Sequence, residues 1–195
     1  MVTLCAFMLL ASPGHPWLIR GDEGFFGFTV AHWRVVTVHG QFTRFSGDAF
    51  IDDAHPENSR LNVTIDTSSV FTGNTARDEH LRSADFFASG RHPRATFVSH
   101  SVHVEGDKWV VEGALTLRGE SHPLTLLVDP VSAEVRNADG ARRRGVHATA
   151  HVSRKELGLV WNKFGPDAVA MVGDDVTLSI DLELLPAPES AVSGR

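Results

Sequence analysis

The stretch Val176-Thr-Leu-Ser-Ile-Asp-Leu-Glu-Leu184 alternates apolar and polar side chains without a break. Successive side chains of a β-strand point to opposite faces, so this pattern predicts a strand with one dry face and one wet face. The same alternation recurs upstream in residues 60–66, 108–118 and 146–153. The chain therefore contains a series of amphipathic strands.

Strands of this kind account for most of the chain. Further candidates cover residues 17–20, 25–30, 37–52, 94–105 and 123–135. Many amphipathic strands in sequence indicate antiparallel sheets that either pack on each other or close into a barrel. Closure at about eight strands leaves an interior that side chains fill or that holds one small ligand. In the longest candidate the inward-facing set changes parity between Phe42 and Phe45, which predicts a bulge or bend.

One stretch departs from the two-residue period. Residues 75–87 carry helix-forming side chains, so we expect one short helix among the strands. Thr75 and Asp78 have the spacing of a capping box, which would satisfy free amides at the helix start. Arg77, Asp78 and His80 cluster there, and we expect Arg77 to tie the helix to the barrel wall through a carboxylate. A rim that receives a polar head group is the alternative role of this cluster.

The inward faces of the strands supply the candidate ligand-binding residues. Within residues 26–32 the alternation places His32 on the same face as the apolar side chains. A histidine there would offer a polar group inside an apolar cavity, and a histidine bonded to a backbone carbonyl near the strand end is the alternative. The residues expected to line an apolar tunnel are Phe26, Phe28, Val30, His32, Phe42, Phe45, Leu115, Leu117 and Ile180.

Composition narrows the class of function. The 195 residues carry a formal net charge of −6, and nucleic-acid-binding domains are normally basic, so we expect no nucleic-acid partner. The single cysteine, Cys5, excludes an intrachain disulfide and a multi-thiolate zinc site. The sequence has no nucleophile elbow, no phosphate-binding loop, no dinucleotide fingerprint and no helical His-Glu-x-x-His motif. We therefore predict no catalytic residue, no metal and no cofactor.

The two ends of the chain differ from the middle. Residues 2–11 form an apolar run about half the roughly 20 residues that cross a bilayer, so we expect no stable membrane insertion. The run has the length of a signal-peptide core but no basic residue precedes it. We favour a periplasmic or secreted location over a cytoplasmic one. The expected division is a signal-like or frayed segment at 1–16, one barrel domain at 17–185 and a flexible tail at 186–195.

Several segments carry, in order, the pattern of a known family. They include Phe28-Thr-Val-Ala-His-Trp33, Thr75-Ala-Arg-Asp-Glu-His-Leu-Arg-Ser-Ala-Asp-Phe-Phe87, Val111-Glu-Gly-Ala-Leu-Thr-Leu-Arg-Gly119 and Val152-Ser-Arg-Lys-Glu-Leu-Gly158. Over residues 17–185 the chain resembles the YceI family of bacterial lipocalin-like, polyisoprenoid-binding proteins. The resemblance implies an all-β fold: an extended antiparallel lipocalin-like β-barrel of about eight strands, with one short helix at residues 75–87, around an elongated apolar tunnel. One departure is Arg20-Gly-Asp-Glu-Gly-Phe25, where the family often has Asp-x-x-His-Ser.

The resemblance and the dry inner faces lead to one main hypothesis for function. The barrel binds an isoprenoid or other long-chain lipid for transport, storage or sequestration, without catalysis. Two alternatives stay open: a lipid-modifying enzyme that uses His32 or the Arg77, Asp78 and His80 cluster, and a filled barrel that acts as an interaction module. Self-association into a homodimer is also left open.

Overall fold

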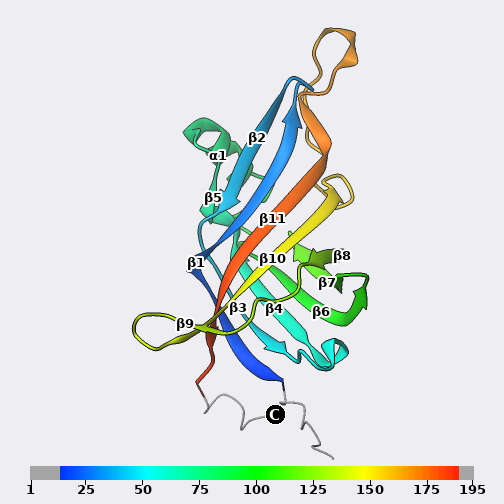
Figure 1. The fold of residues 1–195 in the computed structure, drawn as a ribbon. Coiled ribbons are helices and arrows are strands. Elements are labelled where there is room, and N and C mark those ends of the chain that lie inside the picture. The colour runs from blue at the N-terminus through cyan, green and yellow to red at the C-terminus, as the bar shows by residue number, and fades with distance from the viewer. Residues whose placement is uncertain (1–13, 189–195) are drawn as a thin grey trace, which may run out of the picture.

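The computed structural model describes residues 14–188, which form β-strands, their connections and one short α-helix (Figure 1). Short 3-10 helices occur at Pro56–Asn58, Thr67–Ser69 and Pro166–Ala168. The strands and the helix are β1 (His15–His32), β2 (Val36–Phe42), β3 (Phe45–Ile51), β4 (Arg60–Asp66), β5 (Val70–Phe71), α1 (Thr75–Arg82), β6 (Arg94–Glu105), β7 (Lys108–Leu117), β8 (Glu120–Val128), β9 (Val135–Arg136), β10 (Arg142–Ser153) and β11 (Val172–Pro186).

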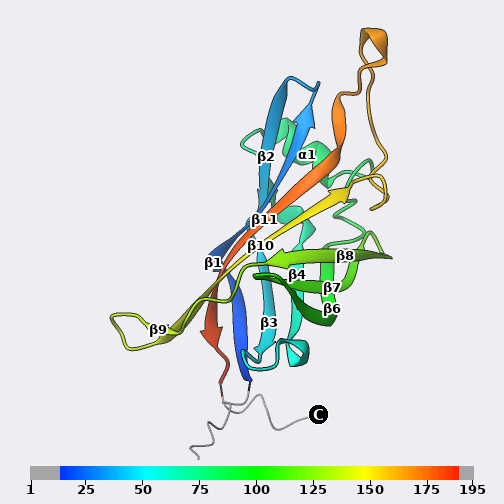
Figure 2. The same cartoon turned by 45° about the vertical axis from the view of Figure 1, so that its right-hand side comes forward.

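Eight of the described strands close into a barrel. They pair antiparallel in the order β1-β3-β4-β6-β7-β8-β10-β11, and β11 returns to pair with β1. The two strands that meet at this closure, β1 and β11, have 18 and 15 residues and run nearly the whole height of the molecule (Figures 1 and 2). The predicted all-β, extended antiparallel barrel is confirmed, and the alternative of two separate packed sheets is excluded.

The first strand serves two partners on the same edge. Its first half pairs with β3 and its second half pairs with β2, and a register irregularity between Ile19 and Gly24 separates the halves. The sequence predicts two separate strands here, at residues 17–20 and 25–30. The structure joins them into β1, because β11 pairs along both halves.

The strand expected at residues 37–52 is in fact two strands, β2 and β3. Thr43 and Arg44 lie between them, and their amides donate to the carbonyl and hydroxyl oxygens of Ser69 at 3.2 and 3.1 Å. These bonds turn the backbone away from the sheet ladder. The parity change in the sequence therefore marks a break between strands that follow each other along β1.

The helix is shorter than expected. It ends at Arg82 and not at Phe87, because the amide of Ser83 donates to the carbonyl oxygen of His80 at 3.0 Å in a tight final turn. Ala88 then adopts a left-handed φ of 50°, and its amide donates to the carbonyl oxygen of Ser83 at 2.8 Å. The remaining residues of the predicted helix form compact turns on the way to β6.

The boundaries of the barrel differ slightly from those predicted. β1 begins at His15, before residue 17, and β11 ends at Pro186. Most of the expected signal-like segment and tail, residues 1–13 and 189–195, lie outside the described residues. The strand expected at 123–135 ends at Val128. The described helices include none that is long and apolar enough to cross a bilayer.

Candidate functional site

The barrel encloses a cavity of about 210 Å³. Its wall consists of inward-facing side chains from the strands together with residues of α1 and the neighbouring loops. Apart from Ser59, Arg60 and Arg154, the lining residues are aliphatic or aromatic. The predicted wall residues that line the cavity are Phe26, Phe28, Val30, Phe42, Phe45, Leu115, Leu117 and Ile180.

His32 is the predicted wall residue that the structure places elsewhere, outside the cavity lining. The pairing of β1 with β11 is irregular between Val30 and His32, where the partner changes from Val176 to Val172. The extra residues of this irregularity lie on β11, whereas β1 pairs regularly with β2 through His32, so His32 lies at the end of β1, beyond the cavity lining. The imidazole is half-buried beside Trp33, with 5.9 Å between the ring centroids. His32 therefore does not line this cavity, and its part in ligand binding stays a prediction.

Phenylalanine rings form a continuous aromatic wall on one side of the cavity. The ring centroid of Phe42 lies 6.1 Å from that of Phe26, 5.9 Å from that of Phe28 and 5.4 Å from that of Phe87. Phe26 in turn lies 5.9 Å from Phe45. These separations are typical of favourable edge-on and tilted ring pairs. No sequence pattern predicts Phe87 as a wall residue, because it follows the helix, where the two-residue period is absent.

The cavity wall is unevenly covered. Leu115 and Leu117 of β7 are 8% and 5% exposed. Phe28 and Val30 in the second half of β1 face the same cavity but are only half-buried, as is Val176 on the paired part of β11. We infer that the mouth of the cavity lies at this end of the barrel, toward the turn between β1 and β2.

The first turn of α1 is held by other bonds than those predicted. The side-chain oxygen of Asn74 accepts from the amide of Arg77 at 3.0 Å, so Asn74 caps the helix in place of the Thr75 and Asp78 box. Asp78 is 4% exposed, and its Oδ1 accepts from the amide and hydroxyl of Thr72 at 2.9 and 2.6 Å. Arg77 donates to the hydroxyl and carbonyl oxygens of Thr72 at 2.7 and 2.9 Å, and not to a carboxylate. These residues hold the helix to the segment before it.

His80 connects the helix to the loop between β10 and β11. Its Nε2 lies 2.8 Å from Oδ2 of Asp85, and its ring packs edge-on against Phe86 and Trp161, with centroids 5.1 and 4.5 Å apart. Phe86 lines the cavity, whereas His80, Arg77 and Asp78 do not. The predicted cluster therefore lies on the helix, outside the cavity lining, and its role as a rim for a head group stays a prediction.

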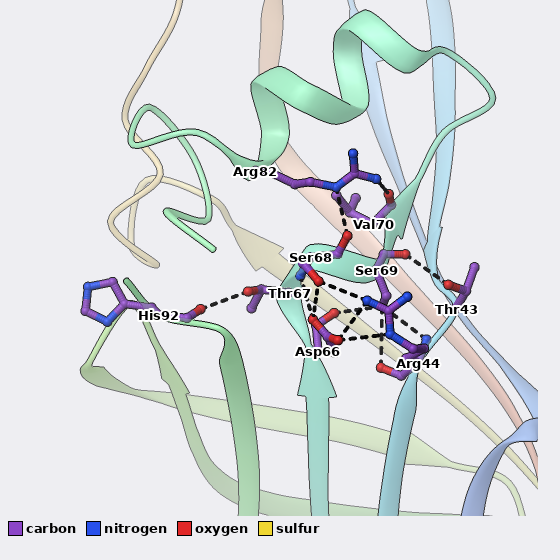
Figure 3. A network of polar contacts seen from close by, with 9 residues as sticks. All are labelled: Thr43, Arg44, Asp66, Thr67, Ser68, Ser69, Val70, Arg82 and His92. Atoms are coloured by element: carbon purple, nitrogen blue, oxygen red, sulfur yellow. Dashed lines mark hydrogen bonds and ion pairs between the residues drawn. The ribbon is translucent and has the colours of Figure 1, made fainter. Parts of the chain in front are cut away.

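A second polar network anchors the end of α1 to the barrel (Figure 3). Arg82 donates through Nε and Nη2 to the carbonyl oxygens of Ser68 and Val70 at 2.8 and 2.9 Å. Asp66 accepts from the amide and hydroxyl of Ser68 at 2.8 and 2.7 Å and from the guanidinium of Arg44 at 2.8 and 2.9 Å. Desolvation raises the pKa of Asp66, but the bonds from Ser68 and Arg44 outweigh it and hold that pKa below its ordinary 3.8.

Arg154 is a charged side chain buried beside the cavity, 3% exposed. A guanidinium has five N–H donors, and here each of them has an acceptor. The acceptors are the carbonyl oxygens of Leu159, Trp161, Val172 and Gly173 and the Oδ1 of Asp174. Burial lowers the pKa of Arg154 and the nearby Asp174 carboxylate opposes this. Because every donor is used, Arg154 fastens the loop between β10 and β11 and offers nothing to a ligand.

The opposite end of the barrel is closed around Trp17, which is 2% exposed. The guanidinium of Arg144 lies 5.8 Å from the Trp17 ring centroid and bonds both oxygens of Asp53 at 2.8 Å. Its Nε also donates to the carbonyl oxygen of Ser132 at 2.7 Å. These contacts join β10, the connection after β3 and the segment after β8.

The mostly aliphatic and aromatic wall of the cavity can bury the apolar surface of a ligand. Within residues 14–188 the His, Cys, Asp and Glu side chains form no group of three that could hold a metal ion. The predicted absence of metal, cofactor and catalysis stays a prediction. A closed antiparallel barrel around an apolar cavity defines the class of ligand-enclosing, lipocalin-like barrels.

Comparison with known proteins identifies the family within this class. The chain belongs to the YceI family, because the YceI-like domain model matches residues 17–184. It is 36% identical over 140 residues to protein YceI of Escherichia coli O6:H1, covering 72% of this chain and 73% of that protein. The crystal structure of Burkholderia cenocepacia BcnA has a similar fold, with a TM-score of 0.71, 22% identity and coverage of 85% and 98% of the two chains. A polyisoprenoid binding domain from Saccharophagus degradans, implicated in plant cell wall breakdown, is similar with a TM-score of 0.61, 18% identity and coverage of 89% and 99%.

Proposed function

We propose that the protein binds an elongated apolar lipid, a polyisoprenoid or a similar chain, in the barrel cavity for transport, storage or sequestration. The observation that carries the proposal is the apolar wall of the cavity. Each methylene that moves from water to such a wall gains about 0.8 kcal/mol, so a long chain binds without any polar anchor. The name of the Saccharophagus degradans domain supports a polyisoprenoid as the ligand class.

The size of the cavity sets how much of a chain it holds. Since a cavity of about 150 Å³ accommodates benzene, one of about 210 Å³ holds on the order of eight carbons, between one and two isoprene units. A longer chain requires the half-buried side chains of Phe28, Val30 and Phe42 to move outward, or part of the chain to remain at the mouth. We expect both, because these side chains are only half-buried.

A polar head group has no partner at the buried arginine of this cavity. Arg154 uses all five donors within the protein, so it does not reach a phosphate or hydroxyl. We therefore place the head group in water at the mouth. The proposal assigns no catalytic step to Asp78 and His80, which are bonded to Thr72 and Asp85 and lie outside the lining.

Native mass spectrometry of gently purified protein tests the proposal. We expect a non-covalent adduct with the mass of a lipid. Leu117→Arg places an unpaired charge on the apolar wall and should abolish the adduct. Leu127→Arg is the matched control, because Leu127 is 43% exposed on β8 and does not line the cavity. Phe28→Gln repeats the test on the half-buried wall, where a loss of folding is less of a concern.

Other outcomes assign other functions. An unmodified mass, together with failure to take up added prenyl lipid, indicates a filled barrel that acts as an interaction module. Conversion of the adduct to a second mass during incubation indicates a lipid-modifying enzyme. A periplasmic or secreted location and a homodimer also belong to the proposal, and cell fractionation and analytical ultracentrifugation test them.

A further inference from the structure

Two loops project together at one end of the molecule, where β1 turns into β2 and where β10 leads to β11 (Figures 1 and 2). The amide of Trp33 donates to the carbonyl oxygen of Met171 at 2.8 Å. The ring of Trp33 also covers Gly165, where a Cβ would lie 3.1 Å from the ring. We call residues 33–36 and 160–171 together the tip.

The tip exposes large apolar side chains. Val35 is 81% exposed, Phe164 67% and Val160 66%, which are the highest values among the large hydrophobic residues of the described part of the chain. Val36 beside them is 56% exposed. Single exposed apolar residues are ordinary, but several gathered on adjoining loops mark an interaction site.

The turn that carries Val35 is strained. Trp33 and Arg34 occupy its central positions with φ values of 52° and 56°, and the amide of Val35 donates to the carbonyl oxygen of His32 at 3.1 Å. Asn and Gly are favoured in such a turn, because larger side chains are strained at positive φ. Strain of this kind is found mainly where function requires it. Here it places two bulky side chains and a valine at the end of the molecule.

The chemistry of the tip fits a lipid surface. Trp33 and Trp161 are half-buried rings at its base, and Lys163 lies 6.0 Å from the Trp161 ring centroid. Tryptophan is enriched where one end of a side chain is apolar and the other is wet, as at a membrane interface. Residues 33–36 and 160–171 contain two basic residues and one acidic residue, in a chain of net charge −6. The tip therefore carries a small positive charge, which an anionic bilayer attracts and does not repel.

We propose that the tip docks on the surface of a lipid bilayer, so that the bound lipid passes between membrane and cavity. This role rests on the proposed function of the cavity. Val30 and Val172, which line the cavity, lie on the same strands just below the tip, and Val172 directly follows Met171. A chain that leaves the mouth at this end enters the bilayer with little exposure to water.

Flotation with vesicles of phosphatidylcholine and phosphatidylglycerol in equal parts tests the docking. Wild-type protein should float with the vesicles. The double variant Val35→Asp/Phe164→Asp should lower the partition coefficient more than about tenfold, because tenfold corresponds to about 1.4 kcal/mol and burying one Phe side chain supplies at least that. The control Val98→Asp/Val104→Asp adds the same charge on β6, at residues 51% and 50% exposed, and should float like wild type.

The outcomes separate docking from lipid binding. Native mass spectrometry of the tip variant should still show the lipid adduct. The docking proposal is overturned if wild-type protein fails to float, or if the control variant loses as much binding as the tip variant. A concentration-dependent dimer that the tip variant abolishes would assign the tip to a second copy of the chain and also overturn it. Flotation of wild-type protein that carries no lipid and takes up none would retain the docking and reject the proposed function.

Discussion

Replacing Arg154 by lysine should destabilise the protein and leave lipid binding intact. The guanidinium uses five donors, and an ammonium offers three from a single point. At least two of the present acceptors therefore lose their partner. They belong to the loop between β10 and β11 and to the start of β11, such as the carbonyl oxygens of Trp161 and Gly173.

The expected loss follows from the count of acceptors. A buried acceptor without a partner costs about 1–3 kcal/mol, and some water reaches this loop, so two of them lower the free energy of unfolding by about 2–4 kcal/mol. Urea unfolding at neutral pH measures the change. With an m-value of about 2 kcal/mol/M, the midpoint should fall by roughly 1–2 M at an unchanged m-value.

Lys155→Met is the matched control, because Lys155 bonds the same carboxylate from outside. Its Nζ lies 2.7 Å from Oδ2 of Asp174, and the two side chains are 51% and 42% exposed. An exposed pair of this kind contributes at most about 1 kcal/mol. The reasoning is refuted if Arg154→Lys unfolds at the wild-type midpoint and loses its lipid, since that result would make the guanidinium a ligand contact.

Four further substitutions test the surroundings of the cavity. Asp78→Ala should lower the free energy of unfolding by about 2–4 kcal/mol, because two hydrogen bonds to a buried carboxylate are lost. Asn74→Ala should lower it by about 0.5–2 kcal/mol, because the helix loses its cap. Thermal unfolding measures both changes, and loss of the lipid adduct at an unchanged melting temperature would contradict a structural role. Asp66→Asn should destabilise at neutral pH. The folded protein lowers the pKa of Asp66, so its stabilising effect is present above the ordinary aspartate pKa of 3.8 and is lost as the pH falls through the folded pKa. If the urea midpoints of Asp66→Asn and wild type differ by the same amount in acid as at neutral pH, this reasoning is contradicted. Phe87→Ala should cost up to about 3–5 kcal/mol and enlarge the cavity, which heavier lipid adducts in native mass spectra would reveal.

The two-residue period predicts the barrel and most of its wall. Leu117 and Ile180 lie on strands whose alternation is uninterrupted, so the inward face follows directly from the sequence. His32 continues the alternation of β1 but lies beyond the cavity lining, at the point where the pairing partner β11 becomes irregular between Val172 and Val176. That irregularity arises from contacts between segments far apart in the chain, and no local pattern contains it.

The sequence also does not predict the arginine side chains that hold the segments around the cavity together. Arg82 and Arg154 bond mainly backbone carbonyl groups, which every residue has, so no side-chain pattern identifies their partners. Arg144 pairs with Asp53 across 91 positions of sequence. Both Asn and Thr are favourable helix caps, so the sequence alone does not decide between Asn74 and Thr75. In the structure Asn74 is the cap, and the Asp78 carboxylate accepts a hydrogen bond from Thr72.

Photo-crosslinking with a prenyl alcohol that carries a diazirine on its chain tests most directly whether the lipid lies inside the barrel. We expect crosslinked peptides to contain cavity-lining residues such as Phe42 and Leu117, and unlabelled prenyl lipid to compete with the reaction. Crosslinks confined to outward-facing residues such as Val98 and Leu127, or labelling that unlabelled lipid does not reduce, would contradict lipid binding in the cavity.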